Sequence, residues 1–311
     1  MKASSKTCFD VSTGIDVGAR DYQEDCLVAD FPMCESYGIG VLADGMGAHA
    51  SGDMASALVV SQVFAALKMR RNMLKSGDAN IPALLKKAVG EANTAMSNFI
   101  KNNPDSKGMG ATLIATVVRD NQLYWLSVGD SPLYLIRNGE IQKLNEDHSM
   151  APQIDAMVAS GQLSAEVAAQ HPDRNCLTSA VLGEEIPRID CPETPMALEP
   201  DDILILASDG LQTLTDGTIL KLANKTAASS SAVVTQNLMS AVEAAAMPEQ
   251  DNISVMVLQI DQMPVMSPEP KTERRIETQP VHRSAEEDAI LAALVPDIEE
   301  APDIINQAMA L

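Results

Sequence analysis

The stretch ILILASDG, residues 203–210, and the stretch GIGVLADG, residues 38–45, are short apolar runs that each end in an Asp-Gly pair. A third acid, Asp251, stands just before another apolar run, NISVMVLQI. The length of these runs, their β-branched residues and the glycines around them predict buried strands. The sequence therefore predicts that the carboxylates of Asp44, Asp209 and Asp251 lie at strand ends.

These three carboxylates would repel one another if the strand ends converge. Two unit charges ~4 Å apart cost roughly 4 kcal/mol at an effective dielectric of ~20, so such a cluster needs cations or bound protons. Hard oxygen ligands with few His or Cys residues nearby favour Mg²⁺ or Mn²⁺. Asp-Gly is also a common turn dipeptide, which leaves each pair, taken alone, with an ordinary structural explanation.

The composition limits the kinds of protein to be considered. With 311 residues, 46% of them hydrophobic, the chain can bury a full core. Its formal net charge of -21 at pH 7 argues against nucleic acid, whose binding draws affinity from Lys and Arg, and against an anionic membrane surface. We see no run of ~18 apolar residues and no signal-peptide pattern. We therefore expect a cytoplasmic protein that works as a monomer.

Strand patterns and helix patterns are segregated along the chain. A meander over residues 110–144 contains the hairpin signal Asn138-Gly139, which predicts antiparallel sheet. This segregation predicts an α+β layered sandwich, with antiparallel sheets inside and helices outside, in one domain of residues 1–262. The other predicted elements are strands over 7–17, 27–29 and 253–260, and helices over 55–67, 85–99 with Asn80 as cap, and 232–246.

Two segments depart from this pattern. Residues 148–183 lack long apolar runs and are predicted as a surface excursion with one short helix around 154–160. Residues 263–311 are predicted as a Pro-rich linker followed by a short acidic tail. In that tail Ser284 and Glu287 form a capping box before an apolar stripe, so it is either a frayed end or a short docking helix.

Arg20 lies in the segment GARDYQED, residues 18–25, close to Glu24 and Asp25. The planar guanidinium group can meet two phosphate oxygens at once. An arginine among acids is usually a surface ion pair, but beside a metal cluster Arg20 becomes a candidate for binding a substrate phosphate.

The order of motifs resembles the metal-dependent Ser/Thr protein phosphatases, the PPM or type 2C family, in its bacterial form. The resemblance covers about residues 8–260 and implies a four-layer αββα sandwich, two central antiparallel sheets flanked by helix pairs. The motifs that carry it are GARDYQED, VLADGMGAHASGDMAS, GMGATL, LSVGDSPLYLI, EDHS, HPDRNCLTSAVLG, LILASDGL and QDNISV.

The resemblance assigns roles to the candidate residues. It implies that Asp44 bridges two Mg²⁺ or Mn²⁺ ions and that the carbonyl of Gly45 binds one of them. Asp209 and Asp251 would hold the other ion. The further assignments are Asp25 reaching a metal through water, Glu24 supporting it, Arg20 binding the substrate phosphate, and Asp130 binding the third metal that many members show.

Some positions depart from the family pattern. Thr213 stands where many members carry a further acid, and Glu249-Gln250 replaces glycines that often precede Asp-Asn. Met46 occupies the place of a histidine proposed as general acid in animal members, so no general acid is assigned. The excursion at 148–183, called the flap segment below, corresponds to the mobile flap of the family and should affect substrate choice.

We expect a protein phosphatase that hydrolyses phosphoserine and phosphothreonine by attack of a water bridging two divalent metals. The bacterial motifs imply that its phosphoprotein substrates are those of a Ser/Thr kinase, which it opposes. The alternative is a scaffold of the same fold that binds phosphoproteins with little or no catalysis. A metal-dependent nuclease also uses clustered acids, but it needs a basic groove, which this sequence does not show.

Overall fold

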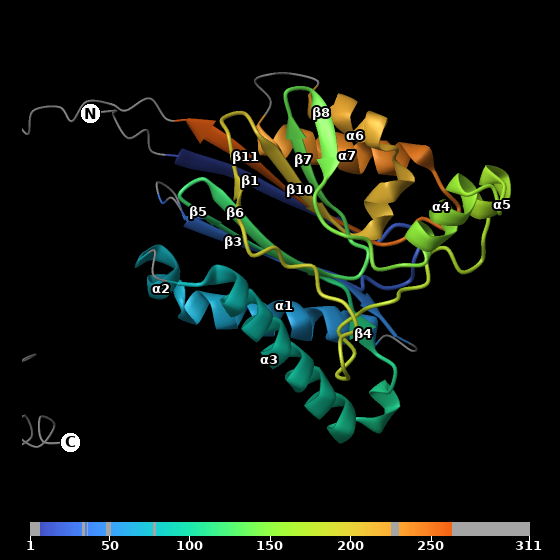
Figure 1. Cartoon of the computed structure of the whole chain (residues 1–311), viewed down its shortest axis with the longest axis horizontal. Helices are drawn as coiled ribbons and strands as arrows, with labels where there is room; N and C mark the ends of the chain where they lie inside the picture. Colours follow the sequence, from blue (N-terminus) through green and yellow to red (C-terminus); the bar gives the residue numbers. More distant parts are fainter. Residues whose placement is uncertain are drawn as a thin grey trace, which may run out of the picture. The chain divides into compact units, whose positions relative to one another are not determined.

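Two antiparallel sheets form the centre of the part of the chain that the structure describes, and helices cover their outer faces (Figure 1). In one sheet the strands are β1 (Thr7–Asp16), β11 (Ile253–Gln262), β10 (Ile203–Ala207), β7 (Leu133–Arg137) and β8 (Glu140–Lys143), in that order. In the other they are β2 (Asp25–Asp30), β3 (Tyr37–Met46), β5 (Leu113–Arg119), β6 (Gln122–Val128) and β9 (Met196–Ala197), with β4 (Gly110–Ala111) paired to β3.

The computed structural model describes residues 7–262 apart from 33–34, 36, 48–50, 77–78 and 225–229. These residues all belong to the first of the two units into which the chain divides, Met1–Val265. The predicted linker and tail at 263–311 lie outside the described residues. The domain bounds 1–262 therefore stay a prediction.

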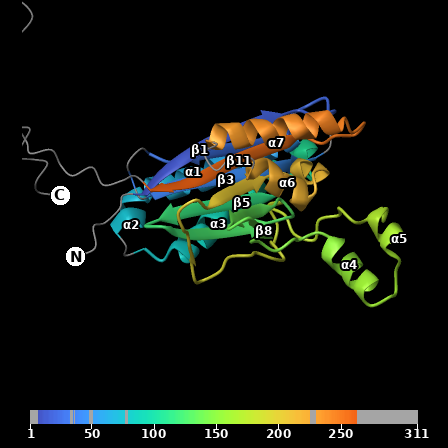
Figure 2. The same ribbon diagram turned by 90° about the horizontal axis from the view of Figure 1, so that it is seen from above.

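Three buried apolar layers hold the sandwich together. Between the sheets, Leu42 and Ile114 pack with Leu204 and Met256 in one cluster. Separate clusters join each sheet to its own helices, so the predicted four-layer α+β sandwich is confirmed (Figure 2). The covering helices are α1 (Gly52–Met69) and α3 (Ile81–Asn102) on the β3 side, and α6 (Asp216–Ala223) and α7 (Ser231–Ala245) on the β11 side.

Local sequence signals place several of these elements. The side chain of Asn80 accepts a hydrogen bond from the amide of Ala83 at 3.0 Å, which is the predicted cap of α3. Asn138 and Gly139 have φ angles of 51° and 78°, so the two-residue turn between β7 and β8 has the twist that the flanking strands require. Within the described ranges, no helix combines the length and apolar character needed to cross a membrane.

The flap segment contains two helices, α4 (Ala151–Ala159) and α5 (Ala165–Ala169), and both project from one end of the sandwich (Figure 2). The prediction of one helix around 154–160 was therefore wrong in number and bounds. Gly161, with φ at 74°, follows the end of α4, and Ser164 caps α5 by accepting from the amide of Val167. Helices this short bury too few side chains to produce a readable stripe: Ile154 is the buried residue of α4, and Ala168 that of α5.

Other short elements were also missed. The helix α2 (Arg71–Ser76) buries one side chain, Leu74, and α6 begins at a Thr215 cap with eight residues. The two-residue strand β9 pairs with β6 far away in sequence. Such elements are stabilised by tertiary packing, which periodicity does not reveal.

Candidate active site

The neighbouring strands β2 and β3 bring the first two predicted acids together. Asp25 pairs directly with Asp44 in the antiparallel register, so their side chains leave the same face of the sheet. β3 does not stop at Asp44-Gly45 as predicted; it continues to Met46 because Gly45 and Met46 pair with β4. The pairing holds Asp44 inside a strand rather than at a free strand end.

The other sheet presents Asp209 and Asp251 from adjacent strands. Asp209 follows β10 and begins the short 3-10 helix η2 (Asp209–Thr213), and Asp251 precedes β11, the partner of β10. The amide of Ser208 donates to the carbonyl of Ser254 at 3.0 Å, which extends the pairing of the two strands to this end. The structure therefore brings both acids to one end of the same sheet.

A hydrogen bond between the sheets joins the two pairs of acids. Ser208, which is fully buried, donates from Oγ to Oδ2 of Asp25 at 2.7 Å and accepts from the amide of Ser254 at 2.9 Å. Ser208 lies in the motif LILASDGL but received no role from the sequence, because its partner is Asp25, 183 residues away. Asp25, Asp44, Asp209 and Asp251 thus share one site, and each is close enough to contribute to the charge interactions of the cluster.

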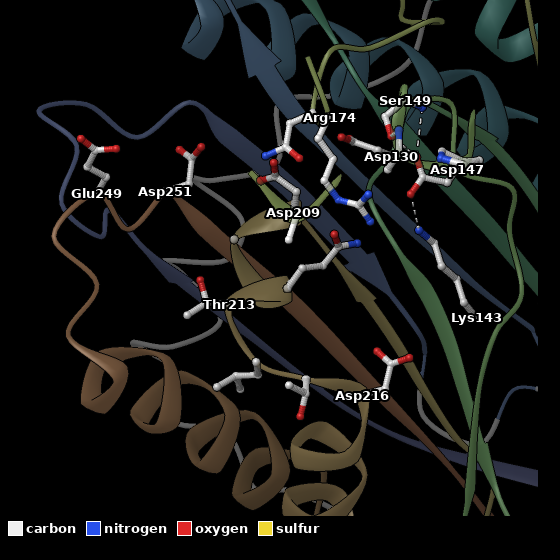
Figure 3. Close-up of a pocket in the computed structure, with 18 of the residues that line it drawn as sticks. Asp130, Lys143, Asp147, Ser149, Arg174, Asp209, Thr213, Asp216, Glu249 and Asp251 are labelled. Carbon is white, nitrogen blue, oxygen red and sulfur yellow. Dashed lines mark hydrogen bonds and ion pairs between the residues drawn. The ribbon is translucent and has the colours of Figure 1, made fainter. Parts of the chain in front are cut away.

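Asp130 approaches from the turn after β6. In Figure 3 Asp209 stands between Asp251 on one side and Asp130 and Asp147 on the other. Behind Asp130, the hydroxyls of Ser131 and Thr112 are 2.8 Å apart, and Thr112 Oγ1 accepts from the amide of Asp44 at 3.0 Å. These two buried hydroxyls tie the turn of Asp130 to the strand of Asp44; both residues lie in the motifs GMGATL and LSVGDSPLYLI, but neither was given a role from the sequence.

Burial dominates the acid–base behaviour of the cluster. It raises the pKa of Asp130 from 3.8 to about 7, and the charges of Asp209 and Asp147 add to this increase. Burial also raises the pKa values of Asp25, Asp44 and Asp209, and neighbouring carboxylate charges push each further in the same direction. Without a cation, the cluster can ionise fully only at a cost in free energy.

The residues present fit divalent cations. Asp25 Oδ1 and Asp209 Oδ1 are buried oxygens without a hydrogen-bond partner, which is unusual unless a cation or water occupies the site. Among the described residues, no three His, Cys, Asp or Glu side chains form a ready-made metal-binding group. Mg²⁺ usually retains several waters and binds through one or two carboxylates, so its site does not require a closed set of protein ligands.

Close backbone packing shapes the surroundings of Gly45. A Cβ atom on Gly45 would lie 2.0 Å from the carbonyl oxygen of Gly52, and one on Gly52 would lie 2.3 Å from Oε1 of Glu24 and 2.9 Å from the carbonyl oxygen of Gly45. Glycine at position 52 therefore leaves the space that the Glu24 carboxyl group and the Gly45 carbonyl group occupy beside it. Sequence reasoning included Gly52 in a motif but gave it no role.

Arg20 contacts an acid in this structure. Its Nη2 atom donates to Asp251 Oδ2 at 2.7 Å, and its side chain is 54% exposed. The loop of Arg20 is held by the buried Asn252, whose amide group donates to the carbonyls of Val17 and Tyr22 and accepts from the amide of Glu24. Arg20 is therefore positioned at the acid cluster by a side chain that the sequence analysis did not single out.

A cavity of about 1130 Å³ opens beside Asp130, Asp209 and Asp251, whereas the buried Asp25 and Asp44 are not among its lining residues. Its lining includes Arg20, Asp130, Asp209 and Asp251, and residues of the flap segment such as Arg174. The resemblance had placed the flap segment near the active site, and the structure puts it in the wall of this cavity.

Residues 34–250 match the model of the family described as Protein phosphatase 2C. A serine/threonine phosphatase of Listeria welshimeri is 34% identical over 173 residues, which make up 56% of this chain and 66% of that protein. The serine/threonine protein phosphatase PstP of Mycobacterium tuberculosis is 36% identical over 182 residues, 58% of this chain and 33% of PstP. The alignments thus cover less than two thirds of either relative.

Solved structures give a longer match. A crystal structure of M. tuberculosis PstP is similar with a TM-score of 0.69 and 29% identity, covering 82% of this chain and 100% of that one. The catalytic domain of PstP in complex with two manganese ions is similar with a TM-score of 0.66, 29% identity and the same coverage. The resemblance drawn from the motifs and these comparisons agree on family and fold.

The raised pKa values predict how stability depends on pH in the absence of metal. The folded state keeps protons on these acids that the unfolded chain releases, so the free energy of unfolding should fall as pH rises from about 4, near the ordinary pKa of 3.8, to about 7. Thermal unfolding with chelator across this range measures the effect.

Asp209→Asn is the matched comparison, because it removes one of the repelling carboxylates and should flatten this fall. Excess Mn²⁺ should raise the melting temperature of the unsubstituted protein more at pH 7.5 than at pH 5. If the melting temperatures of Asp209→Asn and of the unsubstituted protein depended on pH equally, carboxylate repulsion would not be the cause of the fall.

Proposed function

Because the chain belongs to the protein phosphatase 2C family, we propose that it removes phosphate from phosphoserine and phosphothreonine in proteins. The observation that supports this most strongly is the meeting of Asp25, Asp44, Asp209 and Asp251 from both sheets beside an open cavity. Four carboxylates, which offer only oxygen ligands, suit hard divalent cations such as Mg²⁺ and Mn²⁺.

We propose that two Mg²⁺ or Mn²⁺ ions bind at the acid cluster. Asp44 would contact both ions. The Gly45 carbonyl would bind the first ion, and Asp209 and Asp251 would bind the second. Asp25 would reach an ion through water. When bound, the ions lower the pKa of a coordinated water and stabilise negative charge on the phosphate. Glu24 would support this ligand set from outside, and Asp130 is the proposed ligand of a third ion.

Arg20 is the proposed phosphate-binding residue. Its exposed guanidinium group lies at the cavity and has further N–H groups besides the one that meets Asp251. Both oxygens of Asp251 are engaged, Oδ2 with Arg20 and Oδ1 with the amide of Asn252. Binding of Asp251 to a cation would therefore compete with Arg20 and free the arginine for the substrate.

The alternative function, a phosphoprotein-binding scaffold without catalysis, is less well supported. Phosphate binding alone needs Arg20 but gains nothing from several buried carboxylates, which repel an anion. Hydrolysis of para-nitrophenyl phosphate with Mn²⁺, with and without chelator, separates the two. Well-folded protein that shows no turnover with any divalent metal would support the scaffold.

The cellular setting is also a proposal. The Listeria and mycobacterial relatives are named as serine/threonine phosphatases, which supports phosphorylated proteins as substrates and a Ser/Thr kinase as the opposing enzyme. We also propose action in the cytoplasm as a monomer, and the net charge of -21 argues against nucleic acid and anionic membranes as partners. A comparison of phosphoproteomes with and without the active protein would identify the substrates.

Asp209→Asn should reduce turnover by more than about 100-fold, beyond the effect typical of residues outside the ligand shell. It should also weaken Mn²⁺ binding in calorimetry, because a neutral amide replaces a charged ligand. Asp216→Asn is the control, since Asp216 lines the same cavity but accepts a hydrogen bond from Tyr134. Near-normal activity of Asp209→Asn would refute its role as a ligand.

Arg20→Ala should raise KM for a phosphopeptide by about 10-fold or more, since a hydrogen bond to a charged group contributes about 1.5–3 kcal/mol. Arg20→Lys keeps the charge but loses the two-pronged geometry, so its KM should be intermediate. Steady-state kinetics at saturating Mn²⁺ measures both, and an unchanged KM in Arg20→Ala would exclude the proposed phosphate contact.

A further inference from the structure

Gln250 lies directly before Asp251, and its side chain is buried although the residue is polar; it is 8% exposed. Its amide oxygen accepts from Thr213 Oγ1 at 2.8 Å. Its amide nitrogen donates to the carbonyls of Gly210 at 3.2 Å and Asp251 at 3.1 Å. One neutral side chain therefore uses both donors and an acceptor to connect the segment of Asp209 with the segment of Asp251.

The two connected segments lie close together at this point. A Cβ atom on Gly210 would be 2.1 Å from the carbonyl oxygen of Asn252, so only glycine permits this approach. Thr213 and Gly210 both belong to η2, the 3-10 helix that begins with Asp209. The Gln250 amide thus contacts η2 near the start and at the end of this helix. The two contacts limit both the distance of η2 from β11 and the tilt of η2 relative to β11.

The main chain of Gln250 extends the connection to Arg20. The amide of Ala19, the residue before Arg20, donates to the Gln250 carbonyl at 2.8 Å. Gly18 supports this contact with a φ of 62°, and a Cβ atom there would lie 2.7 Å from the same carbonyl. Gln250 consequently contacts three segments that carry proposed site residues.

A neutral link suits this place for an electrostatic reason. Asp209 and Asp251 repel each other, and this repulsion acts to separate η2 from the start of β11. A carboxylate at position 250 would add to the repulsion and could not donate to the two carbonyls. A glutamine side chain adds no repulsion and can donate to both carbonyls, because its amide carries two donors and an acceptor without charge.

We propose that Gln250 is a positioning residue that holds Asp209 and Asp251 at the separation needed to bind a divalent cation, with Thr213 as its partner. The inference rests on the proposed function, because it assumes that these two acids are ligands. Gln250 itself contacts neither substrate nor ion; it acts through the loops of both acids.

Gln250→Met tests the amide, because methionine fills a similar volume without donating or accepting in this way. We expect its Kd for Mn²⁺, measured by calorimetry, to rise by about 10–100-fold, the range typical of residues that orient metal ligands. Gln212→Met is the matched control: Gln212 lies in the same 3-10 helix with an exposed side chain, and its Kd should stay within about 2-fold of the unsubstituted protein.

Activity gives a second readout. Titration with Mn²⁺ should shift the half-maximal activity of Gln250→Met to a higher concentration, with kcat approaching that of the unsubstituted protein at saturation. If Gln250 served folding alone, Gln250→Met would have a lower melting temperature in chelator. The Mn²⁺ concentration for half-maximal activity of its folded molecules would then be unchanged, which would overturn the proposal.

Thr213 provides variants with a smaller change, useful if Gln250→Met does not fold. Thr213→Val removes the hydroxyl group and keeps the shape, so the Kd for Mn²⁺ should rise by several-fold, whereas Thr213→Ser keeps the hydroxyl and should bind as the unsubstituted protein does. Unchanged affinity in Thr213→Val, or equal losses in the Val and Ser variants, would overturn the positioning role.

The outcomes separate this inference from the function on which it rests. If the unsubstituted protein binds no Mn²⁺ and hydrolyses nothing, the proposed phosphatase and the role of Gln250 both fail. If it binds Mn²⁺ and is active, but Gln250→Met binds with equal affinity, only the role of Gln250 is wrong.

Discussion

The repulsion among carboxylates at one end of the sandwich is the constraint on which the rest of the site depends. Two acids come from each sheet, and burial makes the charges of Asp25, Asp44 and Asp209 harder to tolerate. What keeps them together is not attraction but the frame: strand pairing of Asp25 with Asp44, the Ser208 hydroxyl between the sheets, and the packed leucines and isoleucines behind them. The free energy gained by packing the core thus holds the carboxylates together against their repulsion, and a bound cation would reduce that repulsion.

The ion pair of Arg20 with Asp251 has the same origin. An arginine near an unscreened acid cluster will neutralise part of its charge, and Asp251, with a 39% exposed side chain, is accessible to it. This is the surface ion pair that the sequence analysis considered as the ordinary alternative for Arg20. The pair and the proposed phosphate contact are compatible as two positions of one side chain, because the partner that Arg20 prefers depends on what else Asp251 binds.

Features encoded locally were predictable from the sequence, and contacts between distant segments were not. The runs that became β3 and β10, the Asn80 cap and the Asn138-Gly139 turn each depend on neighbouring residues and were confirmed. The proposed site residues came from motif order, and the structure brings them together, although their roles stay proposals. Ser208, Thr112 and Gln250 stand in recognised motifs but received no structural role, because a serine, threonine or glutamine gains its role only from a partner in another segment.

The flap segment leaves and re-enters the sandwich at nearly the same point. Ser149 and Leu177 form an isolated antiparallel bridge, and the amide of Met150 donates to the carbonyl of Cys176 at 3.0 Å, so the neck of the segment is closed. A closed neck makes the intervening stretch an interchangeable cassette, since its length can vary at small entropic cost without shifting the register of the sheets. Changes of length or sequence between these two points would therefore alter the flap residues that line the cavity, such as Arg174, while leaving the strand pairing behind the acid cluster intact.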